Sequence, residues 1–201
     1  MASATGSTQR LSAERKHEIY DAVLELLREV GYQGLSMPTL AARARCSTAT
    51  IYRQWQGKAG LVVAALTSRR PGPPLDIDTG SLRGDLHALV RRLPDIASEE
   101  TELLAALAHA AIRNDEVGRV MREEIAGPAG VMIDSILDRA VARGEMAPDN
   151  PARRYCHYMM MSVAMSRHII DGVYPDGEFL VGLIDSTLVP ALTEGAPEHH
   201  S

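Results

Sequence analysis

Residues 36–55, SMPTLAARARCSTATIYRQW, carry the signals from which the rest of the chain can be interpreted. Ser36 and Ser47 each stand before a short segment whose apolar residues have helical spacing, and serine is a preferred helix N-cap. Ala44-Arg45-Cys46, between the two segments, is short enough to form a tight turn. The apolar residues expected to hold the pair together are Leu40, Ala41, Ala44, Ile51 and Trp55. This stretch therefore predicts two short helices joined by a turn.

The second of these helices carries an unusual set of polar side chains. They are hydroxyls, an amide and a guanidinium, contributed by Ser47, Thr48, Thr50, Tyr52, Arg53 and Gln54. No acidic residue occurs between Gly31 and Ser68, whereas a solvated surface helix usually carries glutamate. Phosphates repel carboxylates, and base edges are contacted by hydrogen-bond donors and small side chains. These residues predict a helix that lies in the major groove of DNA.

Two further helices are expected on either side of this pair. Ser12 should cap the first, which runs to about Val30 and is ended by Gly31. Its inward residues recur at helical spacing and are Ile19, Val23, Leu26, Leu27 and Val30. Gly57 breaks the chain, and a fourth helix over residues 58–67 should turn Leu61, Val62 and Ala65 inward.

The remainder of the chain begins with Pro71-Gly72-Pro73-Pro74, a stiff connector. It marks either a boundary between two domains or a loop between packed parts of one body. Helices are then expected over residues 80–93, 98–113, 116–143, 150–172 and 177–194. Pro128 should kink or break the third of these, and Asn150 with Pro151 should begin the fourth. No strand-like alternation of useful length occurs, so we expect an all-α protein with about nine helices.

Composition and charge set the class of protein. The chain has 201 residues, of which 45% are apolar and 23% charged, as in ordinary globular proteins. No apolar stretch is long enough to cross a bilayer, and the N-terminus has no secretory apolar region, so a cytoplasmic protein is expected. Residues 1–70 hold ten basic and five acidic side chains, and residues 71–201 hold eleven and twenty-one. A basic first third on an acidic remainder favours a polyanion-binding module attached to a second part.

The ordered features of residues 12–70 resemble the TetR family of transcriptional regulators. That family has a first helix ended by glycine, a capped helix-turn-helix with an aromatic end, and a lysine at the start of the next helix. The matching residues here are Ala22-Val23 through Gly31, Leu40-Ala41 with Ala44, Ser47, Ile51-Tyr52, Trp55, Lys58 and Leu61. The resemblance implies a helix-turn-helix DNA-binding domain over 12–70, with the motif itself at 36–55. It also implies a helical ligand-binding and dimerisation domain over 75–194, and residues 1–10 and 195–201 are expected to be flexible tails.

Three positions depart from the family pattern. The turn position that is commonly glycine is Arg45, the glycine early in the recognition helix is Ala49, and the acid that often follows the lysine is Ala59. A non-glycine residue with positive φ at the turn costs roughly 1 kcal/mol. These changes bear on the operator sequence and on close backbone approach rather than on the motif itself.

The resemblance also implies roles for individual residues. Ser36, Tyr52 and Lys58 are expected to contact phosphates, and Arg43 to reach the DNA backbone from the second helix. The residues expected at base edges are Thr48, Ala49, Thr50 and Arg53. Ser47 is expected to cap its helix rather than to contact a base. The alternative interpretation is a helical hairpin whose polar residues are incidental.

The helical remainder offers weaker signals. The segment Tyr155–Met165 is apolar nearly all round, which predicts a helix buried on more than one side, either as plain core or with one face at a pocket. The residues suggested to orient a largely apolar ligand are His87, His109, Tyr158 and Met161. The last helix should contact a second subunit, together with the 150–172 helix, through Phe179, Leu180, Leu183 and Ile184. Packing of that helix within one subunit is the alternative.

Together these features predict a homodimeric repressor of a palindromic double-stranded DNA operator, released by a small apolar inducer. No cofactor, metal site or membrane contact is expected, because no His, Cys, Asp or Glu cluster has metal-site spacing. No nucleophile or acid–base motif occurs, so an enzyme is not expected. The alternative function is a helical small-molecule-binding or scaffold protein whose N-terminal hairpin no longer binds DNA.

Overall fold

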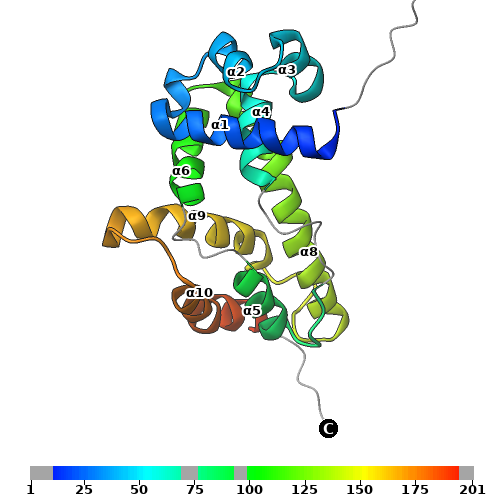
Figure 1. The fold of residues 1–201 in the computed structure, drawn as a ribbon. Coiled ribbons are helices and arrows are strands. Elements are labelled where there is room, and N and C mark those ends of the chain that lie inside the picture. The colour runs from blue at the N-terminus through cyan, green and yellow to red at the C-terminus, as the bar shows by residue number, and fades with distance from the viewer. Residues whose placement is uncertain (1–10, 69–76, 93–98, 195–201) are drawn as a thin grey trace, which may run out of the picture. The chain divides into compact units, whose positions relative to one another are not determined.

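A computed structural model describes residues 11–68, 77–92 and 99–194 of the chain (Figure 1). These residues form helices, turns and short irregular segments, with no strand among them, which confirms the expected all-α class. The chain divides into two compact units, residues 1–69 and 70–201, which are considered separately below. The Pro71–Pro74 connector and both expected tails lie outside the described residues.

Unit 1 contains the four helices expected from the sequence. Helix α1 spans Ala13–Gly34, α2 spans Met37–Arg43, α3 spans Thr48–Trp55 and α4 spans Lys58–Thr67. Side chains cap three of them as predicted, because Ser12, Ser36 and Ser47 each accept a hydrogen bond from the backbone N–H three residues later. Local capping chemistry therefore sets where each of these helices begins.

The core of unit 1 is formed mainly by α1 and α4, which pack against each other and against α2 and α3. Every predicted inward residue is buried except Val30, which is 46% exposed. The chain leaves helical geometry at Gly31, with φ +66° and ψ 170°, and forms one further turn to Gly34. Tyr32 and Leu35, which follow this kink, enter the core in place of Val30.

Unit 2 contains the remaining helices. They are α5 (Leu82–Arg92), α6 (Glu99–Ala111), α7 (Asp115–Met121), the π-helical segment η1 (Arg122–Ala126), α8 (Gly127–Ala142), α9 (Arg153–Asp171), α10 (Gly177–Leu183), the π-helical segment η2 (Ile184–Leu188) and α11 (Val189–Thr193). The five predicted segments are thus all helical, but two of them are divided.

Both divisions precede a proline. Pro128 and Pro190 stand near the starts of α8 and α11, and the π-helical segments η1 and η2 come directly before those helices. Proline has no N–H for the bond to the fourth residue before it, so the regular ladder is interrupted. The break predicted at Pro128 is confirmed in this form, whereas the one before Pro190 was not expected.

The helix predicted to begin at Asn150 and Pro151 begins instead at Arg153. Asn150 is buried, and its side-chain amide donates to the carbonyl oxygens of Ala191, Leu192 and Glu194 at 3.1, 2.9 and 3.2 Å. Its side-chain oxygen accepts the N–H of Ala152. The side-chain nitrogen thus satisfies carbonyls at the end of α11, while the side-chain oxygen keeps a local hydrogen bond two residues along the chain.

The core of unit 2 collects apolar side chains from α5, α8, α9, α10, η2 and α11. On α9, Cys156 is buried and Met159 packs partly against this core. The prediction that Tyr155–Met165 is buried on more than one side is wrong for this chain alone, because Tyr155 and Tyr158 are 52% and 73% exposed. Among the described residues, the other helices of unit 2 leave this face of α9 exposed.

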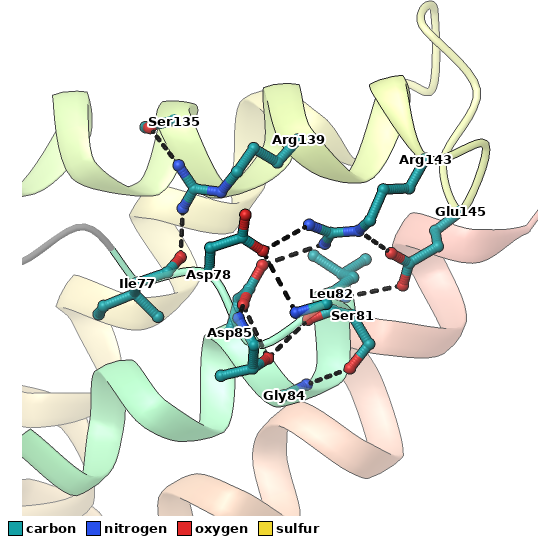
Figure 2. Close-up of polar contacts among 12 residues, drawn as sticks. Ile77, Asp78, Ser81, Leu82, Gly84, Asp85, Ser135, Arg139, Arg143 and Glu145 are labelled. Carbon is teal, nitrogen blue, oxygen red and sulfur yellow. Dashed lines mark hydrogen bonds and ion pairs between the residues drawn. The ribbon is translucent and has the colours of Figure 1, made fainter.

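A buried carboxylate organises the start of α5 (Figure 2). Asp85 has no exposed surface, and it accepts hydrogen bonds from the N–H and hydroxyl of Thr79 at 2.6 and 2.8 Å. Its other oxygen accepts a hydrogen bond from Arg143, the residue directly after α8, at 3.0 Å. Burial raises the pKa of Asp85, but the hydrogen bonds from Thr79 and Arg143 together lower it by more. The pKa therefore lies below its ordinary value.

Glu145 completes this connection between α5 and the end of α8. It accepts a hydrogen bond from Arg143 at 2.5 Å and another from the first N–H of α5, that of Leu82, at 2.7 Å. The first N–H of α5, which has no partner within the helix, is thus bonded to a carboxylate that is itself paired with Arg143 (Figure 2).

Candidate nucleic-acid interface

Helix α3 has one buried and one exposed face. Ile51 and Trp55 are buried, and the indole N–H of Trp55 donates to the hydroxyl of Tyr20 on α1 at 3.2 Å. The exposed side chains, which include four of the residues predicted to contact DNA, are Ser47, Thr48, Ala49, Tyr52 and Arg53. This exposed face carries hydroxyls, a small residue and one cation, and it lacks carboxylates.

Thr50 differs from the other predicted base contacts. It is half-buried, and its hydroxyl lies 2.9 Å from Ser47 Oγ, which also accepts the Thr50 N–H at 3.1 Å. The role of Ser47 as a cap is therefore confirmed. The Thr50 hydroxyl already has a partner at the helix start, so a base contact by Thr50 stays a prediction with a competing local interaction.

The turn between α2 and α3 is closed by two backbone hydrogen bonds. The N–H of Arg45 donates to Ala42 and that of Cys46 donates to Ala41, at 3.2 and 2.9 Å. This is the Schellman arrangement, in which glycine usually occupies the left-handed position. Here that position is Arg45, with φ +49°, as anticipated from the departure from the family pattern.

Arg15 of α1 also contacts this turn. One of its terminal nitrogens donates to the carbonyl oxygens of Ala44 and Arg45, at 2.8 and 3.0 Å, and the other donates to Glu18 at 2.5 Å. This residue was not among those predicted from the sequence. No local pattern reveals it, because the partners are about thirty residues apart in the chain.

The connection from α3 to α4 depends on a glycine that was also not predicted from the sequence. A Cβ added to Gly60 would lie 1.9 Å from the backbone oxygen of Trp55. No real Cβ makes such a contact, so α4 can cross the end of α3 at this distance only with glycine at this position. Between them, Gln56 and Gly57 both have positive φ, at +61° and +134°.

Lys58 begins α4 as predicted, but its ammonium faces the protein. It donates to the carbonyl oxygens of Tyr32 and Leu35 at 3.3 and 2.9 Å, and lies 4.3 Å from the centre of the Tyr32 ring. Ser36, beside this contact, caps α2, and its hydroxyl also lies 2.7 Å from Thr39 Oγ1. The phosphate contacts of both residues stay predictions.

Arg43 forms a paired ion bridge within unit 1. Its two terminal nitrogens donate to the two carboxylate oxygens of Glu29 on α1, at 2.9 and 2.6 Å. The hydrogen bond from Arg43 lowers the pKa of Glu29, and the same bond raises that of Arg43. Both side chains are exposed, so this ion pair is weak. A DNA contact by Arg43 would replace its bonds to Glu29.

The four residues suggested to orient a ligand are not brought into one site. His87 on α5 lies 2.9 Å from Asp185 of η2, which also binds Arg83 at 2.6 Å. His109 on α6 is exposed, and Tyr158 and Met161 lie on the outer face of α9. Within the described residues no hydrogen bond or ring contact joins any two of the four, and their ligand role stays a prediction.

The residues suggested for the subunit contact also separate. Leu180 and Ile184 are 2% and 0% exposed and pack in the core of unit 2, so the prediction that they face a second subunit is corrected. Phe179 is 36% exposed, and Leu183 is half-buried. On α9, Tyr155 and Tyr158 were expected to be buried and are instead exposed.

In the described part of the chain, no three His, Cys, Asp or Glu side chains lie close enough to hold a metal ion. No helix among those residues is both long and apolar enough to cross a membrane. Cys46 and Cys156 are both free thiols, and burial, with a smaller effect of Asp134, raises the pKa of Cys156 to about 11.

Comparison with known proteins identifies the family. Residues 19–65 match the bacterial regulatory proteins of the tetR family, and residues 76–187 match the tetracyclin repressor-like C-terminal domain. The second match alone covers more than half of the chain. This chain belongs to the TetR family. It is a helix-turn-helix, DNA-binding transcriptional regulator, and such regulators are not enzymes.

The TetR-family relatives include two from mycobacteria that align over most of the chain. The DNA-binding transcriptional repressor TetR of Mycobacteroides abscessus is 32% identical over 184 residues, which cover 90% of this chain and 96% of that protein. An uncharacterised helix-turn-helix transcriptional regulator of Mycobacterium tuberculosis is 30% identical over 179 residues, covering 89% and 88%. The repressor KstR of Mycolicibacterium smegmatis is 27% identical and covers 68% of this chain and 67% of its own.

Solved structures of other proteins share the fold. A regulator from Haloarcula marismortui superimposes with a TM-score of 0.60 at 18% identity, covering 92% of this chain and 99% of its own. GusR of Salmonella enterica gives a TM-score of 0.61 at 17% identity, with the same coverage of 92% and 99%. At these identities the likeness concerns the fold alone.

Proposed function

We propose that this TetR-family regulator is a homodimeric repressor that leaves a palindromic operator when a small, largely apolar ligand binds. The observation that carries the DNA-binding part is the exposed face of α3. Thr48, Ala49, Tyr52 and Arg53 are all exposed there, and no carboxylate interrupts them. A helix with this surface can enter the major groove without repelling the phosphates.

Two relatives support the sign of regulation. The mycobacterial relatives named TetR and KstR are described as repressors, and the first aligns with 90% of this chain. Repression by this chain is therefore the simplest proposal. Its operator and regulated genes are set by the base contacts of α3 and must be measured.

The outer face of α9 supports a homodimer. Tyr155, Tyr158 and Met161 are 52%, 73% and 39% exposed, and Phe179 of α10 is 36% exposed. An apolar surface of this kind on a regulator is best explained by burial against a second copy. A two-fold dimer presents two copies of α3, so the operator should be an inverted repeat.

A ligand can release such a dimer only by binding one arrangement of the two α3 helices better than the other. The flexible methionines Met132, Met159 and Met160 pack at the edge of the unit 2 core, and such side chains adapt readily to apolar ligands. A coupling of about 1–3 kcal/mol would weaken operator binding roughly 5–150-fold.

The experiment that tests the proposal is selection of bound duplexes from a random-sequence DNA library with the full chain. We expect enriched sites with two-fold symmetry, bound by one dimer each. The selected duplex then serves as the reporter in a screen of apolar compounds for loss of binding. Enriched sites without two-fold symmetry would contradict the homodimeric operator complex.

A further inference from the structure

Arg15 stands outside the predicted set of DNA contacts, yet it is bonded to the turn that precedes α3. Its guanidinium donates to the carbonyls of Ala44 and Arg45, the two residues at the end of α2 where the helical ladder leaves oxygens without partners. Its second terminal nitrogen is held by Glu18, one turn further along α1. The side chain is about one third exposed, so it is fixed at both ends rather than solvated.

The turn needs this support because of its sequence. Arg45 has φ +49°, where a residue with a Cβ is strained and glycine is not. The bond from Arg15 to the Arg45 carbonyl fixes the peptide that follows the strained residue. A cation at the C-terminus of α2 also opposes the negative end of the helix dipole.

What the turn holds in place is the beginning of α3. Ser47 caps this helix two residues after Arg45, and the exposed residues Thr48 and Ala49 follow at once. The other end of α3 is anchored independently, by burial of Trp55 and by its bond to Tyr20. The turn therefore sets the orientation of the N-terminal half of α3.

We propose that Arg15 is a positioning residue for sequence-specific DNA binding, acting through the Arg45 turn on the start of α3. This inference rests on the proposed function, in which Thr48 and Ala49 meet base edges. Arg15 makes its contribution without touching DNA. Its loss should therefore reduce the preference for the selected sequence and leave general attraction to phosphates unchanged.

The test compares Arg15→Gln with Lys16→Gln, which removes the same charge from the neighbouring residue of α1. Each is titrated with the duplex selected by the wild-type chain and with a scrambled duplex, at several salt concentrations. Arg15→Gln should lower the affinity for the selected duplex roughly tenfold and the affinity for the scrambled duplex less than twofold. The dependence of affinity on salt concentration should not change. Lys16→Gln should leave the ratio between the two duplexes unchanged.

A second arm repeats Arg15→Gln in an Arg45→Gly background. Glycine adopts positive φ without strain, so the turn should keep its shape without Arg15. In this background Arg15→Gln should lower the affinity for the selected duplex less than threefold. The emission of Trp55, the single tryptophan, reports on α3 in each variant. If Arg15→Gln alone does not fold, the double variant should fold and prefer the selected duplex. A double variant that stays unfolded would overturn the proposal.

The outcomes separate this proposal from the one on which it rests. A wild-type chain that enriches no sequence removes the proposed function, whatever Arg15 does. If the wild type enriches a site but Arg15→Gln weakens both duplexes equally and lowers the salt slope by about one, Arg15 contacts a phosphate directly. That result would overturn the positioning role and leave the proposed function standing.

Discussion

Arg15 and Arg45 are thirty residues apart in the sequence, yet the guanidinium of Arg15 donates to the carbonyl oxygen of Arg45 at 3.0 Å. A matching contact exists at the other end of α2, where Lys58 donates to the carbonyl of Leu35 at 2.9 Å. Both ends of the short second helix are thus held by cations from longer helices. A seven-residue helix has little stability of its own, so such contacts matter for the geometry of the motif.

Replacement of Gly60 should destabilise unit 1. A Cβ in Gly60→Ala would meet the Trp55 carbonyl at 1.9 Å, and overpacking of this kind costs roughly 1–3 kcal/mol. Urea unfolding followed by Trp55 emission measures the loss. Gly177→Ala is the matched control, because nothing lies within 4 Å of its added Cβ. An unchanged midpoint for Gly60→Ala would mean that α3 and α4 do not pack this closely.

Lys58→Met should reduce both stability and DNA binding. The carbonyls of Tyr32 and Leu35 would lose a charged donor, at a cost of roughly 1–3 kcal/mol in unfolding free energy. If Lys58 also contacts a phosphate, the affinity for all duplexes should fall about equally, and the salt slope of binding should fall by about one. Urea unfolding and salt titrations of binding measure the two effects. A change in which bases are preferred would contradict the phosphate role.

Arg53→Ala should relax sequence preference rather than remove binding. Arg53 is exposed on α3, and loss of a base contact typically costs roughly 1–3 kcal/mol at particular positions. Repeated selection from random DNA with the variant identifies those positions. Arg113→Ala, an exposed arginine of unit 2, removes the same charge and should leave the selected sequence unchanged. Identical sequences from both variants would exclude Arg53 as a base contact.

Tyr158→Arg should dissociate the proposed dimer. Tyr158 is 73% exposed on α9, so arginine is accommodated in a free subunit, but burial of its charge against a second copy costs several kcal/mol. Sedimentation should show monomers, and affinity for the selected duplex should fall. Ile112→Arg is the control, because Ile112 is equally apolar and 79% exposed but lies between α6 and α7. A dimer of unchanged mass would place the subunit contact elsewhere.

Unit 2 should lose stability in acid through Asp85. In the folded protein the pKa of this carboxyl lies below its ordinary value of 3.8. Its contribution to the free energy of unfolding is therefore complete above that ordinary value. The contribution is lost as the pH falls through the lowered folded pKa. Asp85→Asn should therefore be less stable than the wild type at neutral pH, with a smaller difference near pH 3. Thermal unfolding between pH 3 and 7 measures this, with the exposed Asp149→Asn as the control. A difference independent of pH would exclude the ionised network.

The sequence alone was sufficient for the helices of unit 1 and for the family. Serine caps, apolar spacing and glycine stops act between residues at most four apart, so they are visible in the order of the residues. Ser12, Ser36 and Ser47 therefore marked helix starts correctly, and the acid-free stretch around α3 marked its exposed face. Arg45 could be recognised as a strained turn residue because its place in the motif is local too.

The three-dimensional arrangement was needed wherever a partner lies far along the chain. The contacts of Arg15 with the α2–α3 turn, of Lys58 with the end of α1, and of Asn150 with the end of α11 follow no periodic pattern. Gly60 looks like any helix-weakening glycine until α4 is seen to cross the end of α3. The exposure of Tyr158 likewise depended on how many helices cover α9, since an apolar sequence is compatible with a core and with an interface. Hydrophobic periodicity is a property of one helix, whereas burial and long-range hydrogen bonds are properties of the neighbours that the whole fold supplies.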